Sequence, residues 1–81
     1  MYMTVNDFTS NAWYATEIAI IEEKAHQEAI YKGGDLIENI IEKSLWNGYN
    51  SKLRSDTLQN IKNRYVKSFG AVDDYVVIIV W

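Results

Sequence analysis

The sequence predicts an α+β fold with three helices followed by a C-terminal β-strand. Glycines at positions 33–34, 48 and 70 each follow a segment of helical periodicity, and residues 75–81 form an unbroken β-branched and aromatic run, YVVIIVW. Successive side chains of a strand point to opposite faces, so a run without alternation has two faces to bury. The 81 residues contain no linker or repeat, and we expect one small domain over residues 1–81.

The first helix is expected to begin near the N-terminus and to run through Tyr31. Either Thr4–Asp7 or Thr9–Asn11 can cap it. Its apolar positions recur at nearly helical spacing, namely Tyr14, Ile18, Ile21, Ala25 and Ala29. Gly33–Gly34 then ends the helix, because glycine adopts the left-handed conformation without strain.

Two further helices are expected before the strand. Asp35, with Glu38 three residues later, predicts the start of a helix over residues 35–47, which Gly48 ends. Its apolar face comprises Leu36, Ile37, Ile40, Ile41 and Leu45. The third helix is expected to begin near Ser51 or Ser55 and to end at Gly70, with its apolar face formed by Leu58, Ile61, Tyr65, Val66 and Phe69.

The C-terminal strand needs a partner, because a single strand is not stable in water. Tyr2–Val5 is the segment of this chain that could pair with it, but it is short and would leave the opposite edge open. Pairing with the same strand of a second copy would cover that edge and add apolar area to a small core. We therefore expect the strand to pair with Tyr2–Val5, with a second subunit, or with both, and we expect a homodimer.

The residues that enzymes and metal sites require are scarce in this chain. It has no cysteine and one histidine, and the single Glu23-x-x-His26 pair falls short of the two pairs that a di-iron bundle needs. There is also no Ser-His-Asp set and no glycine-rich phosphate loop. We expect a protein that is not an enzyme and that carries no cofactor or metal.

A nucleic-acid-associated regulator is the alternative hypothesis. Residues 43–81 carry six basic and three acidic residues, and the third helix could present Gln59, Lys62, Asn63 and Lys67 on one face. Two helices joined through Gly48 resemble a helix-turn-helix in outline. However, Arg54 would then occupy an interior position, and the sequence pI of about 4.9 is unfavourable for binding a polyanion.

Aromatic and acidic residues favour a non-catalytic protein-binding module. Trp and Tyr bury large areas at low entropic cost, which makes them common interface anchors. Residues 1–42 carry eight acidic and two basic residues, a charge pattern that suits either a binding surface or a solvated face. The expected interface comprises Trp46, Tyr49, Tyr75, Val77, Ile79, Trp81, Glu22 and Glu23, and Trp46 fits the core equally well.

Residue usage suggests a biological setting. Ile, Asn, Lys and Tyr, whose codons are AT-rich, supply 29 of the 81 residues. This composition is compatible with a small phage or mobile-element accessory protein that inhibits a host protein, such as a defence component, by stoichiometric binding. No apolar run reaches the length of a transmembrane helix, so we expect no membrane association and a cytoplasmic location, in the host cell if the protein is phage-encoded.

Overall fold

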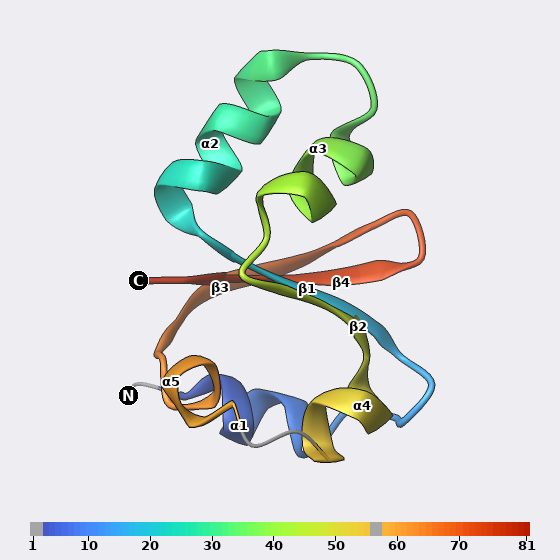
Figure 1. Ribbon diagram of the computed structural model, residues 1–81, viewed down its shortest axis with the longest axis vertical. Helices are drawn as coiled ribbons and strands as arrows, with labels where there is room; N and C mark the ends of the chain where they lie inside the picture. The colour runs from blue at the N-terminus through green and yellow to red at the C-terminus, as the bar shows by residue number, and fades with distance from the viewer. Residues whose placement is uncertain (1–2, 56–57) are drawn as a thin grey trace.

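The protein has three layers, with a four-stranded mixed sheet between two layers of helices (Figure 1). The computed structural model describes residues 3–55 and 58–81. The elements are α1 (Val5–Thr9), β1 (Glu17–Glu22), α2 (Glu23–Lys32), α3 (Leu36–Lys43), β2 (Trp46–Tyr49), α4 (Asn50–Ser55), α5 (Gln59–Lys62), β3 (Val66–Val72) and β4 (Tyr75–Val80). Helices α2 and α3 cover one face of the sheet, and α1, α4 and α5 cover the other.

The C-terminal strand lies inside the sheet, whose order is β2-β1-β4-β3. The strand predicted there is confirmed as β4, but its expected partners are wrong. It pairs in parallel with β1, where Glu17 lies opposite Tyr75, and antiparallel with β3 through a hairpin at Asp73–Asp74. Because both edges of β4 are occupied by this chain, the strand has no open edge for a second copy.

The N-terminal segment does not pair with β4 either. Tyr2 lies outside the described residues, and Thr4 forms an isolated bridge with Tyr65 at the start of β3. Val5 already belongs to α1, which begins with a reciprocal capping box between Thr4 and Asp7. The expected cap at Thr4–Asp7 is therefore confirmed, although it starts a helix of only five residues.

The predicted first helix divides into a loop, a strand and a helix. Its second half is confirmed as α2, which ends at Gly33 with a φ of 76°. Its middle, Glu17–Glu22, is instead strand β1, in which Ile18 to Ile21 are all buried. Four consecutive buried residues need two covered faces, and the sheet provides both, whereas a surface helix covers one.

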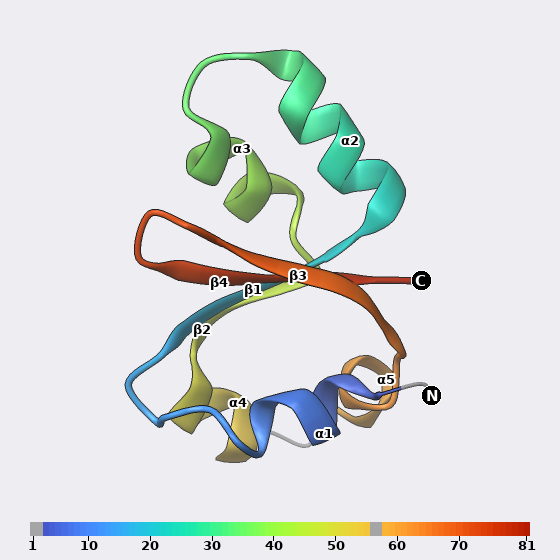
Figure 2. The same ribbon diagram turned by 180° about the vertical axis from the view of Figure 1, so that it is seen from behind.

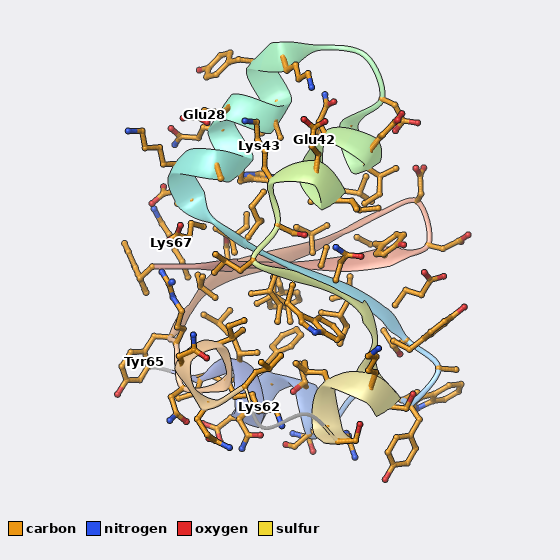
Figure 3. All side chains as sticks on the ribbon, in the orientation of Figure 1. Glu28, Glu42, Lys43, Lys62, Tyr65 and Lys67 are labelled. Carbon is orange, nitrogen blue, oxygen red and sulfur yellow. The ribbon has the colours of Figure 1, made fainter. Side chains whose placement is uncertain are left out.

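The second predicted helix is confirmed over Leu36–Lys43, with the Asp35 side chain accepting the backbone N–H of Glu38. It ends earlier than expected, because residues Trp46–Tyr49 form β2 at the edge of the sheet. Two ion pairs join this helix to α2: Lys43 Nζ lies 3.4 Å from Glu28 Oε2, and Lys32 Nζ lies 3.2 Å from Glu42 Oε2 (Figure 3).

The expected third helix is wrong. Its residues form α4, α5 and strand β3, and Gly70 lies within the strand. The apolar residues Tyr65, Val66 and Phe69 satisfy helical spacing, but the segment Val66–Val72 pairs as a strand with β4, which follows a two-residue turn and shares a ladder of backbone hydrogen bonds with it. Pairing within this hairpin overrides the helical pattern here.

Each face of the sheet has its own core, because alternate residues of the central strands β1 and β4 point to opposite faces. The core beside α1, α4 and α5 contains Val5, Ile18, Ile20, Leu53, Ile78 and Val80. The core beside α2 and α3 contains Ala19, Ile21, Ala29, Ile40 and Val77. The C-terminal run therefore buries both faces, as its unbroken apolar pattern predicts.

Candidate functional site

The outer edge of β3 is open over part of its length. At the start of the strand, the Val66 N–H donates to the Met3 carbonyl at 2.7 Å, so the N-terminal segment covers that end. Beyond it, no described residue outside β4 pairs with the backbone of Ser68–Val72. The β3–β4 register shifts between Val66 and Ser68, as in a β-bulge, which separates the covered part of the edge from the open part.

The direction of the backbone groups on this open edge follows from the hairpin. Val72 and Tyr75 form the first cross-strand pair after the turn. Backbone groups of alternate residues point to opposite sides of an antiparallel strand. Those of Val72 and Gly70 therefore face β4, while those of Phe69 and Ala71 face the open edge, where they can bond to another strand.

An apolar groove runs beside the open edge, between β3 and the segment that joins α1 to β1. Both border the same side of the molecule (Figure 2). The groove has a volume of about 480 Å³. Its apolar walls are formed by Phe8, Ala12, Trp13, Ile18, Phe69, Ala71 and Val76. An open edge and an apolar groove thus coincide on one surface.

The groove continues past a contact between two phenylalanines. The Phe8 and Phe69 ring centroids lie 4.8 Å apart, with an interplanar angle of 54°. On the other side of this pair lies a second hollow of about 510 Å³, lined by Met3, Val66, Lys67 and Ser68 as well as both rings. Phe69 is 64% exposed, so its ring is a projecting apolar side chain between the two hollows.

Two side chains of α4 hold the wall of the groove that carries Trp13. The Asn50 amide is buried and donates to the carbonyls of Thr9, Ala12 and Trp13 at 3.0, 3.0 and 3.3 Å. Arg54 Nη2 donates to the carbonyls of Thr9, Ser10 and Ala12 at 2.9, 2.5 and 2.9 Å. These donors bind carbonyls at the C-terminal end of α1 and in the segment that follows it.

Arg54 also stacks on an aromatic ring, because its guanidinium carbon lies 4.6 Å from the centroid of Tyr14. Arg54, the residue that counts against a helix-turn-helix in the sequence, is thus a partly buried arginine with a structural role. Its role is to fix the backbone of residues 9–12 against α4.

The residues expected at a protein interface do not form one surface. Val77 is buried, while Tyr75 and Ile79 pack against the core beside α2 and α3. Trp46 packs against the other core, which supports the core interpretation of this residue. Tyr49 and Trp81 are exposed, at the β2 edge and beside Lys67 respectively.

Glu22 and Glu23 both lie in ion pairs with basic residues from the second half of the chain. Glu22 Oε2 is 2.8 Å from Arg64 Nη2, and Glu23 pairs with Lys67. The Lys43–Glu28 pair also joins the two halves. The charge asymmetry of the sequence is thus partly neutralised within the molecule.

Tyr75 carries a perturbed ionisation. Its phenol hydrogen-bonds to the Glu17 carboxylate on the neighbouring strand, and this bond raises the pKa of Tyr75 above its usual value of 10.0, helped by desolvation and by the charges of Glu17 and Tyr49. Tyr75 and Glu17 are directly opposite residues of β4 and β1.

The residues of the nucleic-acid hypothesis do not share a helix face. Gln59 and Lys62 lie in α5, a helix of four residues, whereas Lys67 lies in β3. Lys62 is buried, and its ammonium lies 3.4 Å from the Arg54 carbonyl. Lys67 pairs with Glu23, and its ammonium lies 4.6 Å from the centroid of Trp81 (Figure 3). Gln59 and Asn63 are exposed.

The described residues bring no three His, Cys, Asp or Glu side chains together in a group that could hold a metal ion. His26 and Glu23 lie on α2, where Glu23 is already paired with Lys67. Within the same residues, every helix is too short or too polar to cross a membrane. Comparison with protein-family models, with curated proteins and with solved structures finds no match to this chain.

The sequence interpretation missed the residues that line the groove. The predicted helices contain Trp13 and Phe69, and in that arrangement the two residues do not share a surface. One signal was available: Val66–Val72 and Tyr75–Val80 are two β-compatible runs separated by Asp-Asp, which is the spacing of a two-residue hairpin. Reading that signal places Phe69 on a strand beside β4.

Proposed function

We propose that this protein is a non-catalytic protein-binding module that binds an extended segment of another protein along the open edge of β3. One observation supports this above all: the backbone groups of Phe69 and Ala71, which no described residue pairs, lie beside an apolar groove of about 480 Å³. In strand addition, backbone hydrogen bonds provide affinity, and pockets for alternate side chains provide specificity. The β3 edge offers both.

The bound segment runs antiparallel to β3 in this proposal. Its alternate side chains point to the side of α1, and a large apolar side chain opposite Ala71 enters the groove between Trp13 and Phe69. Stoichiometric inhibition of a host protein, the setting suggested by the sequence, requires only such tight binding. We keep that setting as part of the proposal.

The experiment compares two substitutions at one position. Ala71→Pro removes an N–H that faces the open edge, so β3 can keep its bonds to β4 while strand addition is blocked. Ala71→Ser keeps the N–H and is the matched control. The wild type, both variants and a blank resin are used for affinity purification from the native host, and the captured proteins are identified by mass spectrometry.

We expect the wild type and Ala71→Ser to retain the same host protein and Ala71→Pro to lose it. Circular dichroism must show that Ala71→Pro is folded. If a folded Ala71→Pro captures the host protein as well as the wild type does, the binding surface lies elsewhere. If the wild type captures no host protein, the proposed function is wrong.

A further inference from the structure

The open part of the β3 edge is symmetric about its central residue. It spans Ser68–Val72, bounded at one end by the segment that contains Met3 and at the other by the turn at Asp73–Asp74. Gly70 lies at its midpoint. A second copy that pairs antiparallel about a two-fold axis at Gly70 therefore pairs all five open residues, and any shifted register pairs fewer.

This register also satisfies the directions of the backbone groups. Gly70 lies opposite Gly70, and Phe69 lies opposite Ala71 of the other copy. Phe69 and Ala71 both direct their N–H and C=O groups to the open edge, so each such pair exchanges two hydrogen bonds across the axis. The axis gives two of these pairs.

The side chains of the edge are complementary to themselves. Phe69 projects from the strand and is 64% exposed. Ala71, its opposite residue in this register, borders the groove lined by Trp13 and Val76. The two-fold axis thus places the Phe69 ring of each copy at the groove of the other, which would cover both exposed rings. Directly opposite residues of this kind are the units that stabilise a sheet.

The charges follow the same symmetry. Lys67 precedes the open segment, and Asp73 and Asp74 follow it. No ion pair seen among the described residues involves either aspartate. Antiparallel pairing about Gly70 brings Lys67, which also pairs with Glu23 of its own chain, to Asp73 of the other copy, whereas parallel pairing would set like charges together.

We infer that two copies of this chain associate through β3, antiparallel and centred on Gly70, and so join their sheets into one. An edge with no proline and one lysine is otherwise prone to uncontrolled pairing, and a closed two-fold contact covers it. The dimer uses the edge to which the proposed function assigns the partner. A host segment would therefore displace the second copy.

Substitutions at the axis residue test this inference without any partner. A Cβ at Gly70 would meet no heavy atom within 4 Å, so a long side chain fits the isolated chain there. Gly70→Lys and Gly70→Glu each place two like charges against one another across the axis. Mixing the two variants places opposite charges there. Circular dichroism and thermal melting confirm that both variants fold.

Sedimentation velocity over a range of concentrations measures the association. We expect the wild type to reach the mass of two chains, each variant alone to dissociate at least about tenfold more readily, and the equimolar mixture to recover the two-chain mass. A wild type that stays at the mass of one chain overturns the inference. So do variants that dimerise as well as the wild type, or a mixture that does not recover. None of these results depends on host-protein capture, so the two proposals fail separately.

Discussion

Replacing Arg54 by alanine should destabilise the protein by about 2 kcal/mol. The guanidinium donates to three carbonyls and stacks on Tyr14, and a hydrogen bond to a charged group contributes about 1.5–3 kcal/mol. Two of these carbonyls, those of Thr9 and Ala12, keep the Asn50 amide as a donor. The loss is therefore closer to that of one charged hydrogen bond than to that of three.

Urea denaturation followed by circular dichroism measures this loss. Lys52→Ala is the matched control, because Lys52 lies on the same helix and is exposed, and it should change the free energy of unfolding by less than about 0.5 kcal/mol. Arg54→Lys keeps the charge but not the planar guanidinium, so it should fall between the two. Equal stability of wild type and Arg54→Ala would refute the assignment of this arginine as the anchor of the groove wall.

Three further predictions concern the core, the hairpin turn and alkaline pH. Ile40→Ala should lower the free energy of unfolding by about 3 kcal/mol because Ile40 is fully buried, whereas Ile41→Ala, at a partly buried position, should lower it by about 1 kcal/mol. Similar melting temperatures of the two variants would contradict the placement of this core. Asp73 has a φ of 52°, so Asp73→Gly should raise the free energy of unfolding by about 0.5 kcal/mol, while Asp74→Gly, without a positive φ to relieve, should lower it by about as much in the same denaturation assay. The raised pKa of Tyr75 means that the folded state holds this proton more tightly, so its stabilisation is complete below pH 10.0 and is lost as the pH rises toward the folded pKa. Tyr75→Phe should therefore lose less stability than the wild type between about pH 9 and about pH 11. Equal losses of stability in the two proteins would contradict the hydrogen bond between Tyr75 and Glu17.

Local signals in the sequence predict the helices that have their own caps. The Asp35 cap and Gly33 define α3 and the end of α2, and the Thr4–Asp7 capping box starts α1. Each of these features depends on residues three or four positions apart, which a single sequence displays directly. The confirmed C-terminal strand is similar, since its apolar run has no helical alternative that buries it as well.

Strands β1 and β3 could not be assigned in the same way. The residues EIAIIE of β1 fit a helical pattern, and their conformation is decided by pairing with β4, which is 58 positions away at Glu17 and Tyr75. The residues VKSFGAV of β3 also fit a helical pattern, and the two-residue spacing before β4 is the one local signal for their strand. The groove depends on the placement of both strands. Trp13 and Phe69 become neighbours of one surface only after both strands are placed.

The parallel pairing of β1 with β4 has a consequence for biosynthesis. β4 is the central partner of both β1 and β3, and it is translated after every other strand of the sheet. A nascent chain thus holds β1 and β3 before the strand that pairs with both, and the edges of β1 and β3 that face β4 stay unpaired until β4 is synthesised. Pairing of β4 with β1 closes a long loop, which favours slower folding than that of a helical domain of this size.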